Sequence, residues 1–287
     1  MDALIKTLKV LLIRKVASRA EELVREAQGT QSGKMVLYLL ARELGALGPE
    51  LAPFLIRELV MGSARCREGF PEYLRHLCDI RGLACHTGND FMSEVLQRAR
   101  RYQMDEVVEL LTTVPPQRRI YHTDDTERRN PVQDYLPLGV RKSLARKQQA
   151  GSLEALLGEQ NPSVIRNLLG NPRTVEEMVV KMASLRPTSE EVLEEIAIHP
   201  KWGASQRVRK ALAFNPYTPP RTVHAILPTL MLQDLMDATM SPTLHPNVRA
   251  AAKRLIIHRV AGMSPKEKEQ FNHRCGGMLK RIFLETG

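Results

Sequence analysis

Two groups of side chains in the 287-residue sequence are of types that could bind a metal ion or move a proton. The first group is Cys78, Cys85 and His86, with His76 nearby, and thiolates and imidazoles are ligands that zinc prefers. Their spacing matches no standard zinc pattern, and no two cysteines are separated by two residues. Because short helices often bury free cysteines, we expect thiols at these positions, with no metal and no cofactor.

The second group lies in the stretch Val114–Pro137, where His122, Asp124 and Asp125 could serve a metal ion or acid–base chemistry. Arginines flank these acids, and such mixed charge clusters are typically solvated. The sequence also contains no nucleophile elbow, no phosphate-binding loop and no HExxH motif. We assign no catalytic residue, and this favours a non-enzymatic protein.

The residues that could bind a partner are basic. The last 87 residues carry 14 lysines and arginines but only 5 aspartates and glutamates, so most of the net charge of +10 lies there. Such an excess favours an acidic protein segment as partner, with nucleic acid as the alternative and simple solubility as a third possibility. The candidate binding residues are Arg207, Arg209, Lys210, Arg249, Lys253 and Arg254. Trp202 and Tyr217 lie close to them in sequence and could stack on bases or pack in turns.

Helices must position these residues, because the sequence has almost no strand pattern. Apolar residues recur at helical spacing between short breaks of Pro and Gly, which predicts an all-α fold of short antiparallel helices. Thr188 with Glu191, and Thr174 with Glu177, have the spacing of helix N-caps. The predicted breaks are Gly29, Gly45–Pro49, Gly62, Gly82, Pro115–Pro116, Gly158, Pro172, Pro187, Pro200, Pro216, Pro242 and Gly262.

Composition along the chain predicts three regions. Residues 1–113 form an N-terminal helical region, residues 114–137 a linker or long loop, and residues 138–287 a repeat region. The sequence has no membrane span, and its first helix lacks a secretory pattern, so we expect a cytoplasmic protein. Contact of that basic, apolar helix with a membrane surface is an alternative, but its wide apolar arc favours packing in a core.

One phrase recurs in the repeat region. Similar segments start at Val164, Val208 and Val248, which are 44 and then 40 residues apart, and the third segment continues into a longer helix. Two helices in about 40–47 residues are typical of HEAT or armadillo arrays, whose units bury their apolar faces only against each other. The residues that match at the 44-residue offset are Leu168 and Leu212, Asn171-Pro172 and Asn215-Pro216, and Thr174 and Thr218.

The segment "VRKALAFNP" at Val208–Pro216 resembles the leucine-rich-variant type of bacterial α-solenoid, whose units carry "VR..LA.NP..T" phrases. The resemblance covers about residues 137–284. It implies a HEAT-like α-solenoid scaffold, with the N-terminal half a degenerate continuation or a separate bundle. Equivalent helices would then align the cations in one stripe on the concave side. Basic HEAT-like alkylpurine DNA glycosylases are similar in these respects, but we can place neither their catalytic acid nor their aromatic pocket here.

Overall fold

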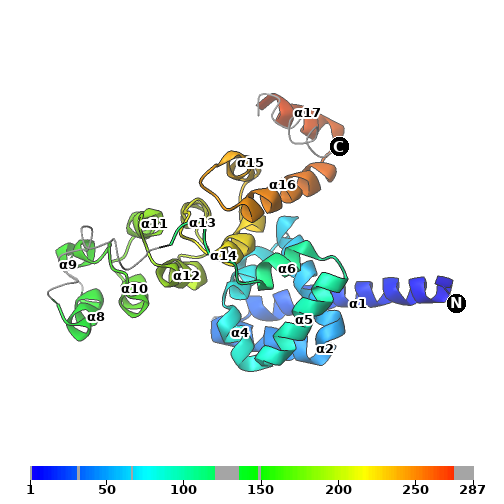
Figure 1. The fold of residues 1–287 in the computed structure, drawn as a ribbon, viewed down its shortest axis with the longest axis horizontal. Coiled ribbons are helices and arrows are strands. Elements are labelled where there is room, and N and C mark those ends of the chain that lie inside the picture. The colour runs from blue at the N-terminus through cyan, green and yellow to red at the C-terminus, as the bar shows by residue number, and fades with distance from the viewer. Residues whose placement is uncertain (1, 31–32, 66, 120–135, 148–149, 275–287) are drawn as a thin grey trace.

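A computed structural model describes residues 2–30, 33–65, 67–119, 136–147 and 150–274, and these residues form helices and connecting loops (Figure 1). The predicted all-α class is confirmed, since no strand occurs in the described ranges. No helix within those ranges is long and apolar enough to cross a membrane. His122, Asp124 and Asp125 lie outside the described residues.

The first half of the chain folds into a helical bundle. Its longest helix, α2, bends at Gly48 (φ 70°), so the predicted break at Gly45–Pro49 is a kink that Pro49 follows. The predicted break at Gly82 is wrong: Gly82 lies inside α4, and its N–H donates to the N-cap Asp79 at 2.8 Å. The elements are α1 (Asp2–Gln28), α2 (Gly33–Ala64), α3 (Phe70–Leu74), η1 (Arg75–Cys78), α4 (Ile80–Thr87), α5 (Asn89–Arg101) and α6 (Asp105–Leu111).

The second half forms a row of short helices, which we call the stack (residues 138–261). α10 packs between α8 and α12, while α11 packs against α13 on the other side of the row (Figure 1). The bounds are α8 (Leu138–Arg146), α9 (Ala150–Ala155), α10 (Pro162–Leu169), α11 (Glu176–Ser184), α12 (Glu190–Ile198), α13 (Gln206–Ala213), α14 (Pro220–Ile226), η3 (Leu227–Thr229), α15 (Leu232–Met240) and α16 (Pro246–Ala261), followed by α17 (Pro265–Arg274).

The two predicted threonine caps are displaced in the structure. α12 is capped by Ser189, whose Oγ accepts from the Val192 N–H, while Thr188 is buried one residue earlier. Thr174 does not cap α11, because its hydroxyl donates backwards to the Leu168 carbonyl at 2.6 Å. A threonine hydroxyl can bond either to the helix that follows or to the one that precedes it, and the sequence does not distinguish these outcomes.

The 44-residue repeat is visible as repeated bonding. The amide of Asn171 donates to the carbonyls of Ala145 and Lys147, both at 2.9 Å. Asn215, 44 residues later, donates in the same way to Ala183 at 2.8 Å and Leu185 at 3.0 Å. Each of these amides ties the end of its helix to the end of a neighbouring helix, and we call both arrangements asparagine clamps. The Thr218 hydroxyl likewise donates to Leu212 at 2.7 Å, as Thr174 does to Leu168.

The period nevertheless contains three helices, which corrects the expectation of two. α10, α11 and α12 all lie between Pro162 and the start of α13 at Gln206. α8, α10 and α12, which pack side by side, begin at residues 138, 162 and 190. A pair of successive helices therefore occupies 24–28 residues. The 44-residue repeat instead relates α10 to α13, which lie on opposite sides of the row.

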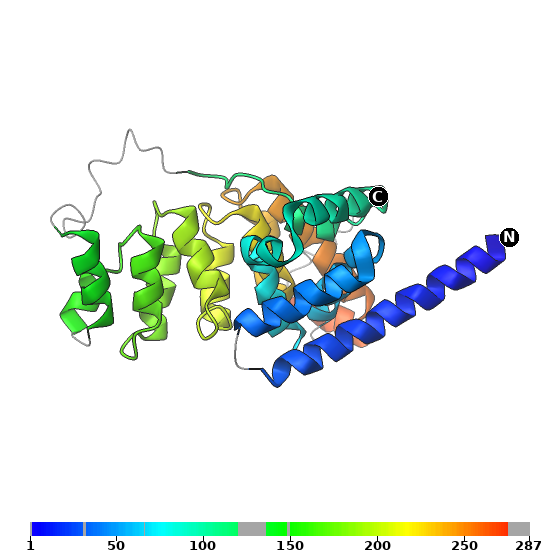
Figure 2. The ribbon, with the colours of Figure 1, turned by 90° about the horizontal axis from the view of Figure 1, so that it is seen from below.

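The C-terminal part of the stack packs against the bundle. After α6 the chain runs along the stack, where the Arg118 N–H donates to the Pro216 carbonyl at 3.0 Å (Figure 2). α14 then packs against α6 and η1 of the bundle. Arg259 of α16 fastens this junction, because its guanidinium donates to the carbonyls of Ala64, Leu230 and Pro228.

Candidate binding surface

Two of the predicted binding residues on α13 are exposed but paired with acids. Arg207 Nη1 lies 2.9 Å from Glu176 Oε2 and 2.8 Å from Glu177 Oε1. Lys210 Nζ lies 2.6 Å from Asp234 Oδ1, and this bond raises the pKa of Lys210. The Arg207 bond correspondingly lowers the pKa of Glu177. Their charge is therefore largely compensated within the protein.

Of the other predicted residues, three are buried or half-buried, and the fourth, Arg254, is exposed but paired with an acid. Arg209 is 4% exposed and donates through Nε to the Gly203 carbonyl at 2.8 Å, so it lies below the surface. Arg249 and Lys253 are half-buried on α16. Arg254, on the same helix, pairs with Glu109 of the bundle.

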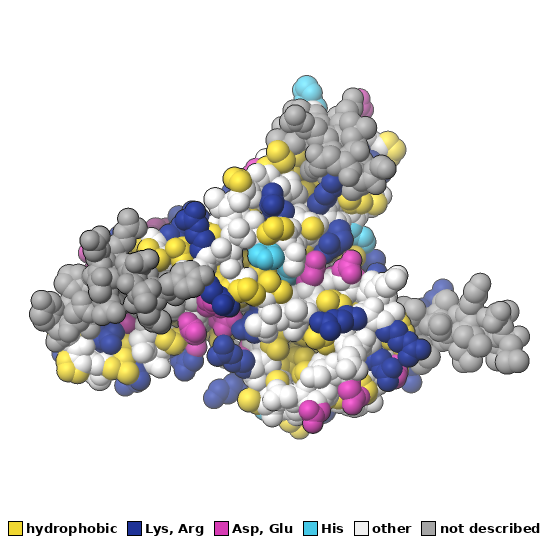
Figure 3. Space-filling model, in the orientation of Figure 1, with side chains coloured by type: hydrophobic (Ala, Val, Ile, Leu, Met, Phe, Trp, Pro, Cys, Tyr) yellow, Lys and Arg dark blue, Asp and Glu magenta, His cyan; other side chains and the backbone are white. Residues whose placement is uncertain are grey.

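These six residues do not form one exposed, uncompensated stripe, because Arg209 is buried and the charges of Arg207, Lys210 and Arg254 are paired with acids. α13 packs on α11, α12 and α14, whereas α16 packs on α14, α15 and η3, so the two helices lie in different surroundings. The acids that compensate Arg207 and Arg254 precede residue 201 in the chain. A count of charges by segment therefore could not detect them. Figure 3 shows acidic and basic side chains together where α16 meets the bundle.

The aromatic residues near these cations are packed rather than available. Trp202 is 5% exposed, and its indole N–H donates to the Leu169 carbonyl at 2.8 Å. Tyr217 is half-buried against the core of the stack. Neither ring is presented for stacking on a base, and the turn-packing interpretation applies to both.

A different set of cations follows one edge of the stack. The C-terminal ends of α8 and α10 are joined there by the Asn171 clamp, and Trp202, just after α12, bonds to the end of α10. The three helix ends therefore lie side by side. Four exposed cations lie at or just after these ends, and we call them the edge cations: Arg146, Lys147, Arg173 and Lys201.

None of the edge cations forms an ion pair within the described part of the chain. Arg146 donates to the neutral amide of Asn167 at 3.2 Å, and Lys201 Nζ lies 4.0 Å from the centre of the Trp202 ring. Cations at helix C-termini are stabilised by the negative end of the helix dipole, which gives them a structural role as well. Lys147, Arg173 and Lys201 recur at 26 and 28 residues, and this shorter period is the sequence signal that would have found them.

A cluster of titratable groups lies at the junction of the stack with the bundle. It lines a cavity of about 120 Å³ and contains Glu106, Glu109, His224, Arg254 and His258. Burial raises the pKa of Glu109, although its bond to Arg254 opposes this. Burial lowers the pKa of His224 to about 3, so its imidazole is neutral although Nδ1 lies 3.6 Å from Glu109 Oε2. The cavity is well below the 300–1,000 Å³ of typical ligand sites, and we interpret the cluster as a junction between the two halves.

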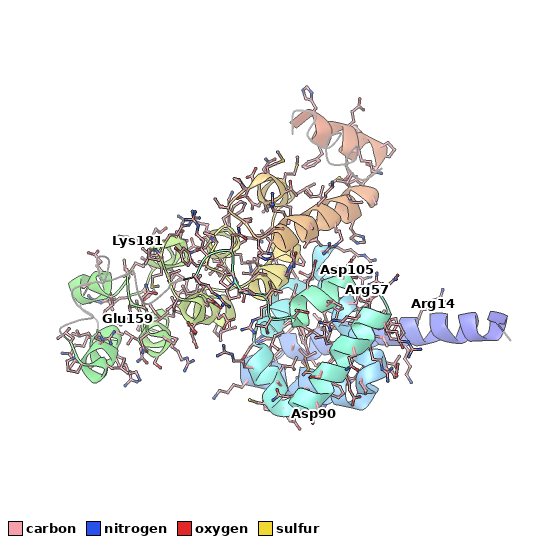
Figure 4. All side chains as sticks on the ribbon, viewed as in Figure 1. Arg14, Arg57, Asp90, Asp105, Glu159 and Lys181 are labelled. Carbon is pink, nitrogen blue, oxygen red and sulfur yellow. The ribbon has the colours of Figure 1, made fainter. Side chains whose placement is uncertain are left out.

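A buried carboxylate also joins helices within the stack. Glu159 is 2% exposed and accepts from Arg141 Nη1 of α8 at 2.6 and 2.7 Å (Figure 4). It also accepts from the N–H groups of Gln160 and Asn161, at 3.0 and 2.8 Å. Since its oxygens are occupied by these donors, Glu159 positions α10 against α8.

The predicted thiols are described only in part. Cys85 is an exposed free cysteine, whereas the side chain of Cys78 is not among those that the structure describes. No group of three or more His, Cys, Asp or Glu side chains within the described ranges could hold a metal ion.

No protein-family model, curated protein or solved structure matches the chain. The interpretation of its function therefore depends on its own residues.

Proposed function

We propose that the protein is a non-enzymatic, HEAT-like α-solenoid scaffold that binds an acidic protein segment along the edge cations. The observation that carries the proposal is the row of exposed, uncompensated Lys147, Arg173 and Lys201 at the ends of three adjacent helices. The six cations on α13 and α16 that the sequence suggested contribute at most a weaker, long-range attraction, because several are paired or buried.

The packing of the stack supports the scaffold part of this proposal. Each short helix buries one face against its neighbours, as in Val164, Ile165 and Leu168 of α10, which are fully buried. Such units stabilise one another in a row and present a long, rigid edge. The clamps at Asn171 and Asn215 hold helix ends in register, and this fixes the separation between the side chains that follow them.

The spacing of the edge cations favours a particular kind of acidic segment. Helices that pack side by side have axes about 8–10 Å apart. A polyproline II segment advances about 9 Å in three residues and returns to the same side. Acidic side chains at every third position of such a segment would therefore face Lys147, Arg173 and Lys201 in turn.

Nucleic acid is the alternative partner, since phosphates would also be attracted to these cations. The burial of Trp202 argues against it, because base stacking supplies much of the affinity for single strands. The two partners differ in a measurable way: peptide binding should depend on the spacing of the acids, whereas phosphate binding should depend mainly on salt.

Fluorescence anisotropy with labelled probes tests this proposal. The probes are a peptide of repeated Glu-Pro-Ser, a control peptide with the same composition but with its acids clustered, a DNA duplex and a single-stranded RNA. We expect the regular peptide to bind more tightly than its clustered control at both about 50 mM and about 150 mM NaCl.

Equal binding of the two peptides would reject recognition by spacing. Binding of the duplex or of the RNA that persists near physiological salt, with peptides bound more weakly, would replace the proposal by the nucleic-acid alternative. No binding of any probe at low salt would leave the edge cations only their stabilising role at helix ends.

A further inference from the structure

A second candidate site lies where α1, α2 and α3 of the bundle face the loops of the stack. It is an open cavity of about 650 Å³, which is within the range of small-molecule sites. The bundle contributes one wall, including Ser63 of α2 and Tyr73 of α3, and the stack contributes Pro200, Gln206 and Pro228. Both halves of the molecule are needed to form it.

Two of the residues that line this cavity, Ser63 and Tyr73, carry a buried hydroxyl without a hydrogen-bond partner among the described residues. Ser63 Oγ and Tyr73 OH belong to side chains that are 0% and 2% exposed, and neither oxygen has a donor or acceptor within reach. Burial also raises the pKa of Tyr73, so its hydroxyl keeps its proton and remains a donor. A buried polar group without a partner costs about 1–3 kcal/mol, and a molecule in the cavity could supply the missing bonds.

The other groups that line the cavity show which chemistry it would accept. Most are apolar or neutral, such as Val24, Val36, Gln28 and Gln206. The one lysine or arginine among the described lining residues, Arg67, already pairs with Glu21 at 3.1 Å. The lining also contains the carboxylate of Glu68, so an anionic ligand would meet a like charge and an arginine that is already paired, whereas hydroxyls and amides can both donate and accept.

The backbone of one wall is shaped by a glycine. Gly69 has φ +79°, and a Cβ there would lie 2.5 Å from Gln28 Nε2 and 2.7 Å from Val24 Cγ1. The absence of a side chain lets the loop before α3 approach α1 closely. The wall that carries Tyr73 is therefore set by local backbone conformation as well as by packing.

We propose that this cavity binds a small molecule of about nucleoside size that carries no negative charge and whose hydroxyl or amide groups bond to Ser63 and Tyr73. This site is separate from the edge cations and does not depend on the scaffold function. Its ligand would also bridge the bundle and the stack, because residues of both line the cavity.

Ligand-observed NMR on the full chain tests this proposal. The neutral probes are adenosine, uridine and N-acetylglucosamine, and the charged comparisons are AMP, glucose 6-phosphate and citrate. We expect at least one neutral probe to bind, and its affinity to fall about tenfold in each of Ser63→Ala and Tyr73→Phe. Ser93→Ala and Tyr38→Phe, on exposed parts of α5 and α2, are matched controls that should bind normally.

The same variants distinguish a ligand site from a structural defect. Without ligand, Ser63→Ala and Tyr73→Phe should melt at the same temperature as the parent or higher, because each removes an unpartnered polar atom. A marked fall in melting temperature would show that the hydroxyls are already bonded within the protein and would overturn the proposal. Failure of all three neutral probes to bind at millimolar concentration, or preferential binding of the charged ones, would also overturn it.

Discussion

At the scale of single residues, buried amides rather than charges hold the stack in register. Asn171 and Asn215 are 5% and 1% exposed, and each bonds to two carbonyls of a neighbouring helix and to one N–H of its own loop. Carbonyls at a helix end have no partner inside the helix, so an amide that reaches them satisfies groups that would otherwise be buried unpaired.

Asn215→Ala should therefore destabilise the protein by about 2–4 kcal/mol, because two carbonyls and the Tyr217 N–H lose their partners together. Urea unfolding followed by circular dichroism measures this change. Asn247→Ala, at an exposed position in the first turn of α16, is the control and should change stability by less than about 0.5 kcal/mol. Equal effects of the two substitutions would show that the clamp is energetically unimportant.

A second prediction at this scale concerns how the stability of the protein depends on pH through His224. Its folded pKa of about 3 lies below the ordinary value of 6.5, so the folded state resists protonation. The stabilisation is complete above pH 6.5 and is lost as pH falls from there towards 3. Between pH 7 and pH 5 the protein should lose about 2 kcal/mol from this residue alone.

His224→Gln removes this titration and isolates it from the others. The pKa values of His245 and His258 are also lowered by burial, but they remain in both proteins and cancel in the difference. Glu109 acts in the opposite sense, because its raised pKa lends stability as it becomes protonated. Denaturant melts at several pH values give the comparison, with His86→Gln as an exposed control. A stability difference that is constant with pH would contradict the burial of a neutral imidazole.

At the scale of helices, the sequence predicted the type of element well and its arrangement less well. Helical spacing and proline breaks identify short helices such as Pro162–Leu169 and Gln206–Ala213. The same pattern placed Val208 and Leu212 in the core, and both are fully buried. The asparagine motif, however, occurs on both sides of the row, so its 44-residue spacing suggested a unit of two helices where the structure has three.

The candidate site was harder to predict for a related reason. Arg207 and Lys210 look free in the sequence because Glu176 and Asp234, their partners, belong to other helices. Pairing depends on tertiary packing, and a charge count along the chain does not contain that information. The edge cations lie at helix ends. Which helix ends lie side by side depends on the order in which the helices pack, and the sequence does not give that order.

Leu212→Ala tests the packing of α13 between its neighbours. Leu212 is 0% exposed, and removing its side chain should cost about 2–5 kcal/mol in a denaturant melt. Met231→Ala is the comparison, because Met231 is 63% exposed and its truncation should cost less than about 0.5 kcal/mol. A small effect at Leu212 would mean that α13 is not packed as described.

At the scale of the whole molecule, the stack and the bundle are joined by side-chain hydrogen bonds and by the packing of helices. Arg259 bonds to carbonyls of both halves, and α14 packs on α6 and η1. The stack extends away from this junction, and the ends of α8, α10 and α12 follow one another along it (Figure 1). A partner bound along the edge cations would therefore contact several helices, whereas a ligand in the larger cavity would contact both halves.

The central claim is that uncompensated cations, and not paired ones, bind the partner, and two matched double variants test it. Each variant replaces one lysine and one arginine by glutamine: Lys147→Gln with Arg173→Gln at the edge, and Lys210→Gln with Arg207→Gln on α13. Affinity for the repeated Glu-Pro-Ser peptide is measured by anisotropy, after circular dichroism has shown that both variants fold. We expect the edge variant to bind about tenfold more weakly and the α13 variant to change by less than about threefold. Equal losses, or a loss confined to the α13 variant, would contradict the account.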